Sequence, residues 1–259
     1  MGLRIVPLAS GSNGNSTLVE IGGTRLLVDA GLSAKALGVA LESVGVAPGS
    51  IDWIVLSHEH HDHARGAVRF SRKHNVPLIC SWPTLDAMEA SPAHVASWQP
   101  LEPGRVLDLG KVTIDPFSIP HDAVDPLGFV FEGEGIRVGV ATDVGHATAR
   151  VVEHLQDCHV LLVESNHDDD MLRDGPYPWH LKERVRGRLG HLSNYEAAWL
   201  LEQVVGDNCQ NVLLGHLSEQ NNTPELAVES ARKALARGGR DSIEVRVAER
   251  RRPSPAVEL

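Results

Sequence analysis

SHEHHDH at residues 57–63 is the stretch that decides the fold of this 259-residue chain. It follows the apolar run Ile51–Leu56, which is typical of a buried strand, and it precedes a helical pattern at Ala64–His74. His58 and His60 are two residues apart, so both side chains point to the same side of an extended chain. The stretch therefore predicts a cluster of histidines at the carboxyl end of a strand.

Asp62 and His63 stand where the chain turns into the helix, so their side chains can point to a second metal position, away from that of His58 and His60. Imidazole and carboxylate groups packed this closely suit a divalent cation such as zinc, manganese or iron. A solvated histidine-rich loop, or a structural site for one metal, would use the same residue types. We nevertheless expect this one run of sequence to supply ligands to two metals.

Three further ligand types follow directly on short apolar runs of the later chain: His121, Asp143 and His216. In folds that contain helices and parallel strands, functional sites gather at the carboxyl ends of the strands. Any one of these residues alone would more often be a strand-end residue that faces solvent. Together with the first cluster, they predict a two-metal centre at one edge of the fold.

The rest of the chain forms two successive blocks, each with β-rich runs first and helix–strand units afterwards. Such an order predicts a sandwich of two mixed sheets with helices outside. We expect one domain over residues 1–250 and a frayed tail over residues 251–259. The expected strands include Leu3–Leu8, Thr17–Ile21, Arg25–Val28, Pro77–Cys80, Val160–Val163 and Asn211–Leu214, and the expected helices include Ser33–Ser43, Tyr195–Val204 and Pro224–Arg237.

Composition restricts the class of protein. No apolar run reaches the roughly 18 residues that a membrane span needs, and the first residues do not resemble a secretory signal. Cys80, Cys158 and Cys209 are isolated and odd in number, which argues against a disulfide framework and a zinc ribbon. We therefore expect a cytoplasmic protein that does not bind membranes. The formal net charge of −10 argues against a general nucleic-acid coat but leaves a nuclease possible, because local charge can differ.

The order H-x-H-x-D-H, then a histidine, an aspartate and a Gly-His pair, resembles the metallo-β-lactamase superfamily over nearly the whole chain. Asp29, in the segment LLVDAG, resembles the first motif of that superfamily. The resemblance implies an α+β fold, a four-layer αββα sandwich of two mixed β-sheets flanked by helices. It also implies that Asp29 ties down the ligand loop without touching metal. By the same resemblance, His58, His60 and His121 hold one metal, Asp62, His63 and His216 hold the other, and Asp143 bridges the two.

Four shorter segments resemble a narrower branch, the YycJ/WalJ/VicX type, whose members resemble DNA exonucleases and related phosphodiesterases. These segments are LASGSNGNS at 8–16, ESNHD at 164–168, YPWHLK at 177–182 and GHLSN at 190–194. The resemblance implies a 5′-to-3′ DNA exonuclease with two divalent metal ions, zinc or manganese first and iron as a further option. In the mechanism we expect, a metal-bridging hydroxide is the nucleophile and Asp62 orients it.

Residues outside the metal set give the expected substrate contacts. The polar, glycine-broken loop at residues 10–16 can form an anion-binding nest or a plain connection between strands. His191 lies at the start of a helix capped by Ser193, where it can contact phosphate or protonate a leaving oxygen. Four cations at Lys182–Arg188 can be a track for a nucleic-acid backbone or a solvated helix face. The residues expected to contact substrate are Ser12, Asn13, Asn15, His167, Arg184 and His191.

Three functions remain open at this stage. The first is a DNA exonuclease, and the second is a hydrolase of a small molecule such as a cyclic phosphodiester, lactone, thioester or β-lactam. The third is an inactive scaffold, against which the complete ligand set argues. An open groove beside the metals would favour a polymer, and a deep closed pocket would favour a small substrate. The sequence leaves the oligomeric state open.

Overall fold

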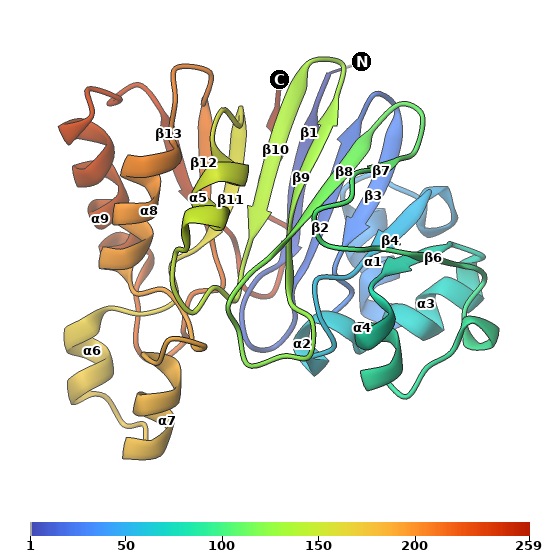
Figure 1. Ribbon diagram of the computed structural model, residues 1–259, viewed down its shortest axis with the longest axis horizontal. Helices are drawn as coiled ribbons and strands as arrows, with labels where there is room; N and C mark the ends of the chain where they lie inside the picture. The colour runs from blue at the N-terminus through green and yellow to red at the C-terminus, as the bar shows by residue number, and fades with distance from the viewer. Residues whose placement is uncertain (1) are drawn as a thin grey trace.

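Two seven-stranded sheets form the centre of the computed structural model, which describes residues 2–259 (Figure 1). The first sheet contains β1 (Arg4–Ala9), β2 (Ser16–Ile21), β3 (Thr24–Val28), β4 (Trp53–Val55), β5 (Leu78–Cys80), β6 (Trp98–Pro100) and β14 (Val257–Glu258). The second contains β7 (Leu107–Asp108), β8 (Thr113–Ser118), β9 (Leu127–Gly133), β10 (Ile136–Ala141), β11 (Val160–Glu164), β12 (Asn211–Gly215) and β13 (Glu244–Val247). The strand orders are β14-β1-β2-β3-β4-β5-β6 and β13-β12-β11-β10-β9-β8-β7.

Helices cover the outer face of each sheet (Figure 1). The first sheet carries α1 (Ala34–Ser43), α2 (His61–Ala64), α3 (Ala67–His74) and α4 (Trp82–Ala87), with short 3₁₀ turns at Pro48–Ser50 and Pro92–His94. The second carries α5 (Ala149–Leu155), α8 (Asn194–Val204) and α9 (Pro224–Arg237), while α6 (Asp169–Asp174) and α7 (Trp179–Val185) extend beyond the lower edge. The predicted four-layer sandwich of two mixed sheets flanked by helices is therefore confirmed.

Successive side chains along a strand point to opposite faces of the sheet, so each sheet has buried apolar side chains on both faces. In β3, Leu26 packs between the sheets whereas Leu27 packs against the helices of the first block. In β11, Leu162 lies between the sheets and Leu161 packs against the helices of the second block. Burial of each such side chain contributes about 1.5–3 kcal/mol, so both sheets are fixed between two apolar layers.

The parallel strands place their carboxyl ends at one edge of the sandwich. β3 to β6 are mutually parallel in the first sheet, and β10 to β13 are mutually parallel in the second. β8 is antiparallel to β9, which is antiparallel to β10, so β8 also ends at this edge. In Figure 1 it is the lower edge, where α2 lies. Every strand-end histidine and aspartate of the sequence analysis is thereby brought to the same place.

The predicted helix Ala64–His74 is two helices in the structure. α2 begins earlier, at His61, and a break at Arg65 and Gly66 separates it from α3. The N–H of Gly66 donates to the carbonyl of Ala30 at 2.8 Å. A Cβ on Gly66 would lie 2.1 Å from the carbonyl oxygen of Leu32. The chain therefore breaks the helix to pack its backbone directly against the loop after β3.

The prediction of a frayed tail was wrong. Val257 and Glu258 pair with Ile5 and Arg4 of β1, and the backbones of Leu3 and Leu259 exchange two hydrogen bonds of 3.0 Å. The tail covers the outer edge of β1, whose backbone groups would otherwise lack partners. The local sequence Arg-Arg-Pro-Ser-Pro gives no sign of this long-range pairing. Among residues 2–259, no helix combines the length and apolar character that crossing a bilayer requires.

Candidate metal centre

The loop after β4 and the ends of three strands bring seven potential metal ligands together. His58, His60, Asp62 and His63 come from the loop, and His121, Asp143 and His216 follow β8, β10 and β12. The ligand atoms of His58, His60 and His121 lie within 4.8 Å of one another, as do those of Asp62, His63 and His216. The two triads that the resemblance implied therefore form two groups in space.

Asp143 lies between the two groups. Its Oδ2 is 3.0 Å from His63 Nε2, and its Oδ1 is 3.8 Å from His121 Nε2. Within the groups, His60 Nδ1 lies 3.3 Å from His121 Nε2, and His216 Nε2 lies 3.5 Å from Asp62 Oδ2. Asp143 Oδ1 also lies 3.3 Å from His216 Nδ1, so the carboxylate contacts residues of both groups, which is the position expected of a bridging ligand.

Buried polar atoms without hydrogen bonds show that the centre fits cations. His58 Nε2 is buried and makes no hydrogen bond within residues 2–259, and Asp143 Oδ2 and His216 Nε2 are buried with only the other ligand candidates His63 and Asp62 beside them. A buried polar atom left unpaired costs about 1–3 kcal/mol. Coordination would remove that cost, and imidazole with carboxylate is a donor set that divalent transition metals accept. The residues present therefore fit two divalent cations.

Three residues of the centre have left-handed backbone conformations, which are uncommon outside glycine. The φ angles are 59° at Asp29, 60° at Asp143 and 54° at His216. Asp29 and His216 stand directly after β3 and β12, and Asp143 stands two residues after the end of β10. Such conformations cost of order 1–3 kcal/mol and persist where the surroundings impose them. The centre thus holds three of the seven non-glycine residues with positive φ among residues 2–259.

Asp29 supports the ligand loop from behind. Its Oδ1 accepts a hydrogen bond from the Ser57 N–H at 2.8 Å, and its Oδ2 lies 2.7 Å from His63 Nδ1. With Nδ1–H donated to Asp29, His63 presents Nε2 to the centre. Burial disfavours the charged imidazole, but Asp143 and Asp29 outweigh that effect and raise the pKa of His63 well above its usual value. The position of Asp29 is the supporting one that the resemblance implied.

Glu164 supports two histidines at once, and the sequence analysis did not assign it a role. Its Oε1 lies 2.8 Å from His191 Nδ1 and 2.9 Å from His216 Nδ1. Its Oε2 accepts from the backbone N–H groups of Val144 and Leu192. Burial raises the pKa of this carboxyl, but His191 and His216 outweigh that effect and lower it to about 2. The one available signal was a carboxylate at the end of the apolar run 160–163.

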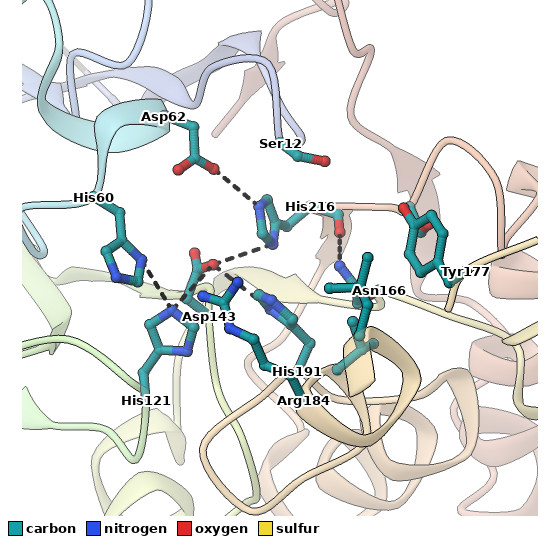
Figure 2. Close-up of a pocket in the computed structure, with 13 residues that line it drawn as sticks. Ser12, His60, Asp62, His121, Asp143, Asn166, Tyr177, Arg184, His191 and His216 are labelled. Carbon is teal, nitrogen blue, oxygen red and sulfur yellow. Dashed lines mark hydrogen bonds and ion pairs between the residues drawn. The ribbon is translucent and has the colours of Figure 1, made fainter. Parts of the chain in front are cut away.

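A cavity of about 200 Å³ opens over the centre (Figure 2). Asp62, His121, Asp143 and His216 form its metal side, and the remaining walls come from other loops and from α7. Of the residues expected to contact substrate, Ser12, Arg184 and His191 line the cavity, and its remaining lining residues are His60, Asn166, Tyr177, Leu181, Val185 and Ser218.

Arg184 places a cation beside the centre. Its Nε donates to Asp122 Oδ2 at 2.6 Å, and Asp122 Oδ1 lies 3.3 Å from His121 Nε2. The ion pair orients the guanidinium over the cavity, where its other N–H groups can meet an anion (Figure 2). Asp122 was not singled out in the sequence.

The other expected substrate contacts lie outside the cavity. Asn13 is exposed, and its amide lies 3.5 Å from Glu219 Oε2. Asn15 is buried; its Oδ1 accepts from the Gly11 N–H at 2.7 Å and its Nδ2 lies 2.9 Å from His63 Nε2. His167 is also buried. Asn15 therefore braces the ligand loop, and these three residues do not face a substrate in the cavity.

Comparisons with known proteins agree with this geometry. The model of the Metallo-beta-lactamase superfamily matches residues 9–163. Exodeoxyribonuclease YycJ of Bacillus anthracis is 34% identical over 241 residues, which cover 92% of this chain and 91% of the relative. Exodeoxyribonuclease WalJ of Streptococcus pneumoniae is 37% identical over 231 residues, which cover 88% of this chain and 86% of the relative.

Solved structures match the whole fold. The metallo-beta-lactamase fold protein YhfI from Bacillus subtilis covers 100% of both chains with a TM-score of 0.74 at 17% identity. A diphosphatase from the PhnP family covers 100% of this chain and 98% of its own with a TM-score of 0.69, also at 17% identity. At these identities, the similarity establishes the fold alone.

Proposed function

We propose that this chain, which belongs to the metallo-beta-lactamase superfamily and is a metal-dependent hydrolase, is a DNA exonuclease that removes nucleotides in the 5′-to-3′ direction. The observation that carries the proposal is the pairing of the two ligand groups with Arg184 and His191 across one small cavity. Two cations and a guanidinium around one space suit a phosphodiester, which is an anion. The two exodeoxyribonucleases that align over about nine tenths of the chain support DNA as the polymer.

The size of the cavity favours attack at a chain end. Its volume of about 200 Å³ is below the roughly 300–1,000 Å³ of ordinary small-molecule pockets. One terminal nucleotide with its phosphodiester, held partly in the open mouth, suits this space better than a bent internal segment. The same small volume favours a cyclic phosphodiester as the second candidate substrate.

The expected cofactors are two divalent metal ions, zinc or manganese first, with iron as a further option. When bound, they would supply positive charge that makes water a nucleophile near neutral pH and offsets the charge of the phosphate. The residues that would hold them are His58, His60 and His121 for one, Asp62, His63 and His216 for the other, and Asp143 for both.

Three side chains of the protein, those of Asp62, His191 and Arg184, have the remaining roles in the reaction. Burial opposes ionisation of Asp62, but His216 and His63 outweigh that effect and lower its pKa, so Oδ2 accepts a hydrogen bond from the attacking water. His191 donates Nδ1–H to Glu164, which leaves Nε2 to contact a phosphate oxygen or to protonate the leaving oxygen. Arg184 N–H groups bind the phosphate and hold it in line.

The test is hydrolysis of an end-labelled, 5′-phosphorylated DNA strand by the purified protein with manganese or zinc. We expect stepwise shortening that the double variant Asp62→Ala, His63→Ala loses. A strand that stays intact with metals shown to be bound, beside rapid hydrolysis of a cyclic dinucleotide, would reject DNA and establish the second candidate.

A further inference from the structure

Four exposed cations lie just before α3 and along it, in a chain whose formal net charge is −10. We call Arg65, Arg69, Arg72 and Lys73 the α3 basic face. Arg69, Arg72 and Lys73 are three and four residues apart within α3, so their side chains share one side of that helix, and Arg65 precedes them at the break after α2. All four are exposed, while Ala67 and Phe70 on the opposite side are fully buried in the core. A stripe of cations along one helix face is the usual electrostatic footprint of a nucleic-acid contact.

No acidic partner neutralises this face. Within residues 2–259, none of its four side chains makes an ion pair or a side-chain hydrogen bond with another residue. In the tail, by contrast, Arg251 is paired with Glu219 and Arg252 with Glu249. The α3 basic face is therefore an unneutralised positive region on an acidic protein.

The cations at 182–188, which the sequence left open as a nucleic-acid track or a solvated helix face, are mostly engaged with other groups of the protein. Lys182 Nζ donates to the carbonyl of Arg173, and Arg186 pairs with Glu183. Arg188 Nη2 lies 3.0 Å from His146 Nε2. Only Arg184 of that run reaches the cavity, so α7 offers a single phosphate contact and no track.

The α3 basic face follows the metal centre closely along the chain. Arg65 is the residue after α2 and stands two positions beyond His63, whose ring lies in the centre. From there α3 leads away along the outside of the first sheet, on the side opposite to α6 and α7 (Figure 1). A nucleic-acid strand that has one end in the cavity and leaves it on the α2 side would therefore extend along α3.

We propose that the α3 basic face binds the sugar–phosphate backbone of the nucleic-acid strand whose end lies in the metal centre. The inference rests on the proposed nuclease function and adds the surface that binds the nucleic-acid strand outside the metal centre. Guanidinium groups bind phosphate oxygens through paired N–H donors without reading the base sequence. The grip is therefore independent of sequence and weakens as salt rises.

The test compares two charge-reversal variants of equal net charge. Arg69→Glu, Arg72→Glu removes the centre of the α3 basic face, and Arg232→Glu, Lys233→Glu is the control on exposed positions of α9, at the far side of the molecule. Binding of a fluorescent single-stranded oligodeoxynucleotide with phosphorothioate linkages, which resist cleavage, is measured by anisotropy over a range of salt. Hydrolysis of bis(p-nitrophenyl) phosphate reports on the metal centre, because this ester is too short to reach α3.

We expect the α3 variant to bind the oligonucleotide at least about tenfold more weakly and to lose about 0.7 of the log–log salt slope for each phosphate contact removed. Its hydrolysis of the small ester should stay near the wild-type rate, and the α9 control should bind like wild type. The neutral variant Arg69→Gln, Arg72→Gln should show an intermediate loss.

Two results would overturn the inference: equal binding by the α3 variant and the α9 control, or no binding of the oligonucleotide by the wild-type protein. Wild-type binding that the α3 variant loses, without any cleavage of ordinary DNA, would support this surface and reject the proposed nuclease function. DNA cleavage by a protein whose α3 variant binds like the control would reject this surface and leave the proposed function intact.

Discussion

The carboxylate of Glu164 holds His191 and His216 by their Nδ1 atoms and turns both Nε2 atoms toward the cavity. Its other oxygen accepts from two backbone N–H groups, so every side of the carboxylate meets a donor. An amide has a donor of its own and cannot replace both oxygens. Individual residues of this centre are thus positioned by groups that touch no substrate.

We predict that Glu164→Gln lowers kcat and metal affinity by about 10–100-fold, the usual cost of losing a support behind a metal ligand. The reason is that one of the two histidines, or the loop at Val144 and Leu192, loses its acceptor. Metal affinity is measured by competition with a chelator, and Glu153→Gln, an exposed change on α5, is the matched control. Unaltered metal affinity in the Glu164 variant would contradict the positioning role.

The seven candidate metal ligands could be singled out from the sequence because each is a ligand residue type that follows an apolar strand or lies in the segment just after one. Glu164 and Asp122 could not, because their partners, His191 and His216 for Glu164 and Arg184 for Asp122, come near them only in the folded chain. Asn13 and His167 were misplaced for the same reason: a polar residue in a site loop can face either the cavity or the protein. From the sequence one can predict that a polar residue lies near the end of a strand, but not whether its side chain points into the cavity or into the protein.

At the scale of elements, the break between α2 and α3 lets the chain after the ligand loop pack directly against the loop that follows β3. Gly66 approaches the backbone of Ala30 and Leu32 so closely that no side chain fits between them. We predict that Gly66→Ala destabilises the fold by about 1–3 kcal/mol, the usual cost of overpacking, and lowers activity by displacing Asp62 and His63. Urea denaturation and kcat measure the two effects.

Gly49→Ala is the control for this prediction, since a Cβ there meets nothing within 4 Å. Gly49 lies in an exposed 3₁₀ turn remote from the ligand loop. If Gly66→Ala were as stable and active as Gly49→Ala, the close approach could not be what positions the loop.

Glu20 links the first three strands through Arg4 of β1 and Arg25 of β3, each at 2.7 Å. Burial raises the pKa of Glu20, but hydrogen bonds from Arg25 and Arg4 outweigh that effect and lower it. A carboxyl whose pKa is depressed by folding stabilises the native state above its unfolded pKa of about 4.3. That contribution is lost as the pH falls through the lower pKa of the folded state.

We therefore predict that Glu20→Gln lowers Tm at pH 7 and that the gap to wild type closes as the pH is taken down toward 3. The measurement is Tm by calorimetry across this range for both proteins. A gap that stayed constant with pH would show that packing, and not the charge of Glu20, accounts for the difference.

The elements themselves were predictable where they are long or clearly capped. Ser193 and Glu196 form the expected capping box at the start of α8, and Pro224–Arg237 is the helix that the pattern indicated. Shorter elements such as α6 and α7 were not predicted. Each is six or seven residues long, lies beyond the lower edge of the sheets in Figure 1 and buries a single side chain, Leu172 in α6 and Val185 in α7, so the sequence shows no periodic apolar face.

Over the whole molecule, the two sheets bring strand ends from distant parts of the chain to one edge of the sandwich. The candidate metal centre lies at that edge. Ligands from residues 58 to 216 meet in it, so any cation that binds the centre also ties the two halves of the sandwich together. The pairing of the tail with β1 shows the limit of local reasoning at this scale, since its partner strand begins at residue 4.

The central claim is that this centre works with two cations. The most direct measurement is a titration of metal-free protein with manganese or zinc, in which bound metal per chain and DNA hydrolysis are followed together. We predict that hydrolysis rises until two cations are bound per chain and then levels off, and that Asp62→Ala, His63→Ala binds one cation and stays inactive. Full hydrolysis with a single bound cation, or hydrolysis without any, would contradict the two-metal account.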